Sequence, residues 1–185
     1  MSRIPDYCPP GFTQYTVVRG DTIFLIARRL RIDTGLIIAN NPHISNPLLI
    51  FPGDILCVPI TIALPCCTVL RALTPTGNAT EIGVVLAQQL PNGEQAVSFL
   101  ATGLPNPSKF GNFDAYEGFI SFPGIGSFSF VLVSTPEMLP TWSRTITLAR
   151  SILFSGANIQ IRTTNTTTYL LPTVVLQGNL CTNVK

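Results

Sequence analysis

The side chains that could catalyse a reaction are few in this sequence and poorly spaced for it. The one histidine is His43, and residues 63–185 contain none, so a cysteine there lacks the histidine that would activate it. Nor does any C-x-x-C spacing or histidine set suggest zinc. A glycosidase needs two carboxylates across a cleft, but the closest pair, Asp114 and Glu117, stands in a Gly- and Phe-rich segment typical of a solvated turn. We expect no enzyme, no metal and no cofactor.

The five cysteines allow two interpretations. They stand at positions 8, 57, 66, 67 and 181. In a reducing cell they are idle or buried thiols, whereas an oxidising environment permits disulfides. An odd count leaves at least one thiol free or bonded to another molecule.

Composition excludes several classes of partner. Of the 185 residues, 46% are hydrophobic and only 11% are charged, against about 25% charged in typical globular domains. The net charge of +2 argues against nucleic acid, which needs a dense basic face. No apolar run approaches the ~20 residues of a membrane span, so we expect no membrane partner. No apolar stretch follows Arg3, so the N-terminus does not resemble a secretory signal and we expect synthesis in a cytoplasm.

The hydrophobic pattern changes near residues 61–65. Before them, alternation in 14–18 predicts a strand, and a stripe from Ile23 to Leu30 predicts a helix capped by Asp21 or Thr22. A second helix is predicted through 36–38, capped by Asp33 and Thr34 and ended by Asn41, because Pro42 follows. Residues 55–59 predict another strand. The expected order is strand, helix, helix, strand.

These residues resemble a LysM domain over about 13–60. The matching positions are Tyr15, Val17, Gly20-Asp21-Thr22, Ile26-Ala27, Asn41-Pro42, Ile44, Pro47, Ile50, Pro52-Gly53 and Val58-Pro59. The resemblance implies a βααβ fold that binds N-acetylglucosamine polymers, either peptidoglycan or chitin, between the loops 20–23 and 41–50. The implied glycan-binding residues are Gly20, Asp21, Thr22, Ile23, Asn41, Pro42, His43, Ile44, Leu48 and Leu49.

The implied fold also suggests how the cysteines are used. Cys8 precedes the first strand and Cys57 lies in the second, which pairs with the first in a βααβ fold, so we expect a disulfide between them. Cys66 and Cys67 are adjacent and can hardly bond to each other without strain. With Cys181 they form a group from which at least one thiol is left over, and they are the candidates for an intermolecular disulfide.

The second segment predicts seven or eight short strands, separated by Gly-, Pro- and Asn-rich turns. The predicted strands are 67–73, 80–89, 95–102, 116–122, 127–134, 145–148, 158–163 and 167–176. They favour an antiparallel β-sandwich of jelly-roll or immunoglobulin-like form. We expect Trp142 and the phenylalanines in core or rim packing rather than in a sugar-binding platform. The whole chain is then α+β, with a LysM domain at 1–62, a linker at 63–66 and a β-sandwich at 67–185.

Function is expected to be structural and non-catalytic. Sparse charge and open strand edges favour a self-assembling homo-oligomer or polymer attached to peptidoglycan or another N-acetylglucosamine polymer. Its place would be a spore coat, surface layer or fibre. A monomeric wall-binding adaptor and a peptidoglycan hydrolase are the alternatives.

Overall fold

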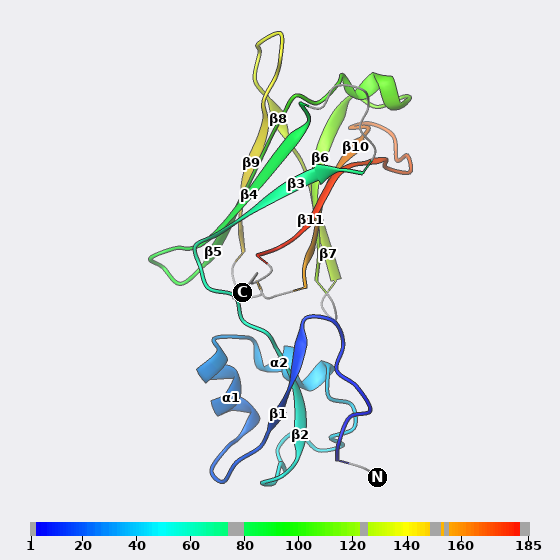
Figure 1. The fold of residues 1–185 in the computed structure, drawn as a ribbon. Coiled ribbons are helices and arrows are strands. Elements are labelled where there is room, and N and C mark those ends of the chain that lie inside the picture. Colours follow the sequence, from blue (N-terminus) through cyan, green and yellow to red (C-terminus); the bar gives the residue numbers. More distant parts are fainter. Residues whose placement is uncertain (1–2, 74–79, 123–125, 149–152, 154–155, 182–185) are drawn as a thin grey trace.

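The computed structural model describes residues 3–73, 80–122, 126–148, 153 and 156–181. Its N-terminal module (residues 12–59) has the predicted order of strand, two helices and strand (Figure 1). Its elements are β1 (Phe12–Thr16), α1 (Ile23–Leu30), α2 (Thr34–Ala39) and β2 (Ile55–Pro59). β1 pairs antiparallel with β2, with Phe12 opposite Pro59.

Local chemistry sets the helix ends. The Thr22 side chain accepts a hydrogen bond from the Leu25 N–H and caps α1, and Asp33 caps α2 in the same way through Gly35. Arg31 adopts a left-handed conformation and ends α1. Within the described residues, no helix combines the length and apolar character needed to cross a bilayer.

The helices pack on the small sheet through the predicted stripe. Ile23, Ile26 and Ala27 of α1 are buried with Ile37 of α2 and Leu56 of β2 in one cluster. Each of these side chains has an exposed fraction of 4% or less. The helical spacing therefore identifies the face that forms this small core.

The remainder is a β region (residues 66–181), whose described residues form nine antiparallel strands. The strands are β3 (Cys66–Ala72), β4 (Ile82–Gln89), β5 (Gln95–Thr102), β6 (Ala115–Phe122), β7 (Gly126–Val131), β8 (Val133–Ser134), β9 (Trp142–Leu148), β10 (Asn158–Thr164) and β11 (Val174–Asn179). A short 3₁₀ helix, η1 (Pro107–Phe110), follows β5. The strand order is β7-β6-β10-β11-β3-β4-β5-β9-β8.

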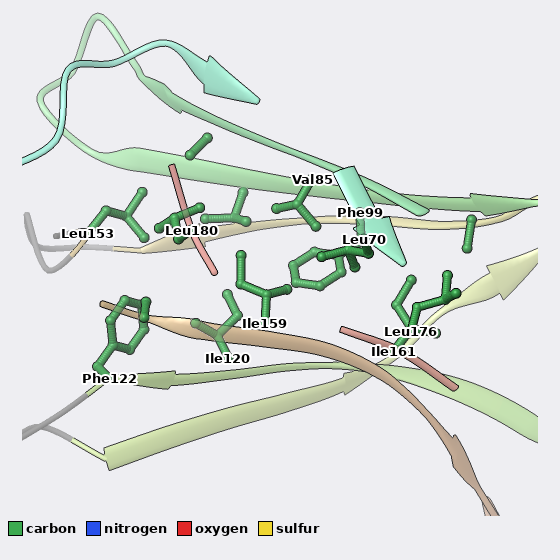
Figure 2. Close-up of a cluster of buried hydrophobic side chains, with 14 of the residues drawn as sticks. Leu70, Val85, Phe99, Ile120, Phe122, Leu153, Ile159, Ile161, Leu176 and Leu180 are labelled. Carbon is green, nitrogen blue, oxygen red and sulfur yellow. The ribbon is translucent and has the colours of Figure 1, made fainter. Parts of the chain in front are cut away.

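This sheet folds over so that its two halves face each other across an apolar core (Figure 2). Buried side chains alternate along the strands, as in β10, where Ile159 and Ile161 are fully buried. The expected antiparallel sandwich is therefore present. Because β11 also pairs with β3, the two halves form one sheet, unlike the two separate sheets of an immunoglobulin-like sandwich.

The sheet nearly closes into a barrel. Its two edge strands, β7 and β8, are consecutive in the chain and are separated only by Leu132. The Leu132 N–H donates to the Tyr116 carbonyl at 2.8 Å and continues the pairing with β6, whereas Val133 pairs with Ser143 of β9. The predicted single strand 127–134 therefore changes its partner strand at Leu132. Little free edge is left at β8, which has only two residues.

Trp142 belongs to the core, as predicted. Its exposed fraction is 8%, and its ring meets Tyr116 edge-to-face at 5.1 Å between centroids. Phe99 and Phe130 meet in the same way at 5.0 Å. Such pairs add specific packing to the burial of apolar area.

The prediction of the last strand is wrong in its position. β11 begins at Val174, not at 167, because Asn165 organises a turn there. Its side-chain oxygen accepts from the N–H groups of Thr167 and Thr168. Local side-chain bonds of this kind compete with strand formation.

The prediction for the C-terminal cysteine group needs correction. Cys66 and Cys181 form a disulfide within the chain, with Cα atoms 5.9 Å apart. The start of β3 lies beside the turn after β11, where the Cys181 N–H donates to Thr68 Oγ1 at 2.8 Å. Among the described residues, only Cys67 is a free cysteine, and it is exposed. Cys66 belongs to β3, so the proposed linker ends before it.

The N-terminal module and the β region are in contact. Phe12, Leu36 and Cys57 of the module belong to the same buried cluster as the sheet core. At the contact, a Cβ on Gly156 would lie only 2.9 Å from the Gly11 Cα. Glycine is therefore needed there for close approach, and also for its φ of +87°.

Candidate functional site

Two loops meet at the end of the N-terminal module that is farther from the β region (Figure 1). The Val17 N–H donates to the Asp54 carbonyl, and the Gly53 N–H donates to the Val17 carbonyl, both at 2.9 Å. The loop after β1 (residues 17–22) therefore lies against the end of the loop before β2 (residues 41–54). The structure thus joins the two loops that the resemblance implies.

Asp21 organises the first loop. Its carboxylate accepts hydrogen bonds from the Tyr15 hydroxyl at 2.6 Å, from the Val18 N–H at 3.1 Å and from Arg29 at 2.6 Å. These bonds, the Tyr15 bond foremost, hold the pKa of Asp21 below its usual range. The carboxylate is thus committed to holding the loop in shape.

Asp54 organises the second loop with Arg3, and sequence reasoning missed both. The Arg3 guanidinium donates to both Asp54 oxygens at 2.6 Å and to the Leu49 carbonyl at 2.7 Å. Asp54 also accepts from the Phe51 N–H, and the bond to Arg3 is the largest cause that lowers the pKa of Asp54. One signal for Asp54 was available in the sequence, because it directly follows the Pro52-Gly53 pair that matches the LysM pattern.

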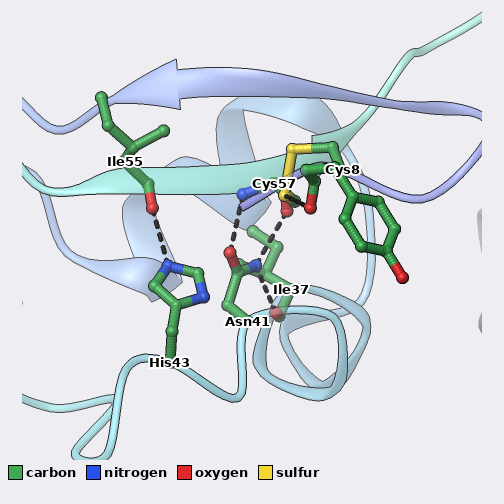
Figure 3. The surroundings of a disulfide bond; sticks show 7 residues. Cys8, Ile37, Asn41, His43, Ile55 and Cys57 are labelled. Atoms are coloured by element: carbon green, nitrogen blue, oxygen red, sulfur yellow. Dashed lines mark hydrogen bonds between the residues drawn. A yellow bond between two sulfur atoms is a disulfide. The ribbon is translucent and has the colours of Figure 1, made fainter. Parts of the chain in front are cut away.

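Asn41 ties α2 to β2 (Figure 3). Its side-chain NH₂ donates to the carbonyls of Ile37 and Cys57, and its oxygen accepts from the Cys57 N–H at 2.6 Å. Cys57 is also bonded to Cys8, the expected disulfide partner, with a Cα–Cα distance of 5.4 Å. The polar atoms of Asn41 are therefore used inside the module.

His43 also points into the module (Figure 3). Its Nε2 lies 2.8 Å from the Ile55 carbonyl oxygen. A carbonyl can only accept, so Nε2 carries the proton. The ring supports the loop before β2.

The implied site residues thus fall into two groups. Ile23 and Ile44 are buried in the module core, while Asp21, Asn41 and His43 hold the loops and Thr22 caps α1. Thr22 is also exposed, and the other exposed members are Gly20, Pro42, Leu48 and Leu49. The exposed fraction of Leu48 is 91% and that of Leu49 is 54%, so these two leucines offer apolar contact to a ligand.

Other exposed apolar side chains lie in or beside the same loops. They are Val18, Phe24 and Phe51, each with an exposed fraction above one half. Sequence reasoning missed them because an apolar residue next to a helix stripe or a strand is ordinarily assigned to the core. Rigid loops with apolar side chains can contact the CH faces of a sugar, while their backbone groups bond an acetamide.

The two carboxylates considered as candidates for glycoside hydrolysis, Asp114 and Glu117, are both bonded to other side chains or to the backbone. Both oxygens of Asp114 accept from Thr166, at 2.9 Å from its N–H and 2.6 Å from its hydroxyl, and these bonds lower the pKa of Asp114. Glu117 is paired with Arg162. A glycosidase acid needs a raised pKa, which is the opposite of what Asp114 has.

The βααβ fold and the joined loops are those expected of a LysM domain, and residues 15–59 match the LysM domain model. LysM domains bind peptidoglycan or chitin, which are polymers that contain N-acetylglucosamine. Residues 62–183 match the model described as SPbeta prophage-derived uncharacterized protein YoqH, and the chain belongs to this family.

A relative carries the same description. The YoqH protein of Bacillus subtilis (strain 168) is 34% identical over 122 residues, which cover 63% of this chain and 81% of the relative. No solved structure gives a significant match.

Proposed function

We propose that the chain is a non-catalytic protein of a cell wall or cell surface whose N-terminal module binds a polymer containing N-acetylglucosamine. The LysM match carries the proposal. The side chains of Asp21, Asn41 and Asp54 are bonded within the module, while Leu48 and Leu49 face solvent. Affinity for one short oligosaccharide is expected to be modest, because the contact area is small.

The proposed binding residues are Gly20, Pro42, Leu48 and Leu49, with the backbone of their loops, and the other implied residues act by holding those loops. We also propose residues 1–62 as the binding unit, with residues after 66 as a second unit. The engagement of Asp114 and Glu117 supports a non-catalytic role.

A pull-down of the full chain on purified peptidoglycan and on chitin tests the proposal. The double substitution Leu48→Ser and Leu49→Ser should weaken retention about tenfold, because it removes two exposed apolar contacts. Leu171→Ser is the matched control, since Leu171 is 81% exposed but belongs to the β region. The proposal fails if wild-type chain binds neither polymer, or if both variants bind like wild type.

Self-assembly into a coat or fibre is a second proposal, supported by the exposed thiol of Cys67 on β3. This thiol can form a disulfide with a second copy. Non-reducing gels of the oxidised protein should show dimers that Cys67→Ser abolishes. If the chain stays monomeric at high concentration, with or without oxidant, self-assembly is refuted and the monomeric wall-binding adaptor is the alternative that stands.

A further inference from the structure

β7 is the less protected of the two edge strands of the sheet. It pairs with β6 on one side and has six residues, whereas β8, at the other end of the strand order, has only two. β7 contains neither a charged residue nor a proline, and its pairing with β6 has no bulge. Natural proteins usually protect an edge strand by such devices, because its free backbone groups can pair with another strand.

The register with β6 determines which backbone groups of β7 point away from the sheet. The Leu132 N–H donates to the Tyr116 carbonyl in this register. Antiparallel residues alternate between bonded and non-bonded pairs, so residues 127, 129 and 131 direct their N–H and C=O groups outward. Among the described residues, one hydrogen bond reaches these outward groups, from Arg144 Nη1 to the Val131 carbonyl at 3.0 Å.

The side chains of β7 add aromatic surface to this free edge. Phe128 and Phe130 lie on the core face, where the Phe130 ring meets Phe99. Phe128 keeps an exposed fraction of 40%, because β7 is the last strand at this end of the sheet. Ser127 and Ser129 are exposed on the opposite face. A further strand beside β7 would therefore gain backbone hydrogen bonds and cover aromatic surface.

The sequence of β7 is suited to pairing with a second copy of itself. A two-fold axis at Ser129 makes the two strands antiparallel and places residue 127 opposite the partner's residue 131. The outward groups then meet each other, since bonded positions lie opposite bonded positions. Phe128 lies opposite the partner's Phe130, and aromatic residues directly opposite each other stabilise an antiparallel pair. The Val131 carbonyl can accept a second hydrogen bond beside that from Arg144, because it has two lone pairs.

The distribution of charge also fits a second copy. A two-fold axis places each residue near it opposite its own kind, so a charge at that position would be repelled. β7 carries no charge. On the neighbouring strands, Glu117 and Arg162 form an ion pair with each other. Arg144 lies at Val131, which is at the end of the strand and away from the axis.

We propose that the β7 edge pairs with the β7 edge of a second copy, so that one sheet continues across two molecules. This gives a surface to the self-assembly proposed above, but it does not depend on Cys67, which belongs to the inner strand β3. Six residues a side are fewer than the roughly 20–30 of a standard interface. We therefore expect a reversible dimer with a Kd of roughly 10–100 µM.

The pairing has a consequence for the N-terminal modules. β7 begins at the end of the β region that is nearer to the module (Figure 1). Antiparallel pairing of two copies therefore turns their modules to opposite ends of the dimer.

A cysteine placed at the two-fold axis tests the pairing and its register. In a Cys67→Ser background, Ser129→Cys should form an intermolecular disulfide, because bonded antiparallel residues have Cα atoms about 5.5 Å apart, within disulfide reach. Ser127→Cys is the matched control, an exposed serine of the same strand whose copy would lie about 13 Å away. Ser129→Cys should cross-link at least about tenfold faster. Equal rates, or faster cross-linking of Ser127→Cys, overturn the proposal.

Sedimentation of the full chain measures the dimer without a cross-link. The Cys67→Ser protein, which cannot form a dimer through that thiol, should pass from monomer to dimer over roughly 10–500 µM. Adding Ser129→Lys should weaken the dimer at least about tenfold, because it places two like charges opposite each other. Leu100→Lys adds the same charge at an exposed position of the inner strand β5 and should have no effect. A monomer throughout this range, or equal weakening by both lysines, overturns the proposal.

The loop variant Leu48→Ser, Leu49→Ser separates this proposal from glycan binding. It should lose retention on the polymer and dimerise like the wild type. If it fails to dimerise, the contact lies in the N-terminal loops and the β7 pairing is overturned. If the wild type dimerises but binds neither polymer, only the proposed glycan binding fails.

Discussion

Replacing Asn41 by alanine should open the N-terminal module while leaving the β region folded. The substitution leaves three buried backbone groups without their partner, namely the Cys57 N–H and the carbonyls of Cys57 and Ile37. Each such group costs about 1–3 kcal/mol, and the costs do not add fully. We therefore expect the local free energy of opening to fall by about 3–5 kcal/mol.

Hydrogen exchange measures this effect, because it reports on local opening amide by amide. Amides of α2 and β2 should exchange roughly a hundredfold faster or more, and those of β4 and β5 should not change. Tryptophan fluorescence would miss the effect, since Trp142 lies in the β region.

Asn40→Ala is the matched control. Asn40 is partly buried and its side chain makes a single bond, to the Leu36 carbonyl at 2.9 Å. Its loss should cost only about 0.5–1.5 kcal/mol. If the two variants accelerate exchange equally, the three bonds of Asn41 stabilise the module no more than the single bond of Asn40 does.

Three further predictions concern thiols, disulfides and pH. Native protein should expose one thiol per chain to Ellman's reagent, and Cys67→Ser should expose none, as a spectrophotometric titration will show. Replacing both cysteines of the Cys8–Cys57 disulfide by serine should lower the free energy of unfolding by about 4 kcal/mol in the chain-entropy model, because the bond closes a loop of 49 residues. The same change at Cys66–Cys181, which spans 115 residues, should lower it by about 5 kcal/mol. Urea titration measures both effects. The pKa of Asp54 is lower in the folded state, so the ionised carboxylate stabilises the fold above about pH 4, and this stabilisation is lost as the pH falls further. Loop opening measured by hydrogen exchange should therefore rise below about pH 4 in the wild type, and rise less in Asp54→Asn.

The secondary structure of the N-terminal module could be predicted from the sequence, because the residues that determine it lie close together in the chain. Helix caps at Thr22 and Asp33 lie next to the stripes that they begin, and β2 was predicted with the bounds that the structure has. The roles of Arg3 and Asn41 were not readable, because their partners lie 51 and 16 residues away in the chain. Only the folded backbone brings these groups together.

The β region shows the same limit. Alternation located most of its strands, including β5 with its correct bounds. It failed for β11, where Asn165 competes through its own side chain, and for 127–134, where the chain passes from pairing with β6 to pairing with β9. The pairing of Cys66 with Cys181 depends on strand order, which alternation does not contain.

Each of the two disulfides lies within one part of the molecule: Cys8–Cys57 belongs to the N-terminal module and Cys66–Cys181 to the β region. Neither crosses from one part to the other, so residues 60–65 are the one covalent connection, and the contact through Phe12 and Leu36 is non-covalent. A single protease cut in this connection should leave a particle that still migrates as one species under native conditions. The same particle should separate into two pieces in denaturant, even without reductant.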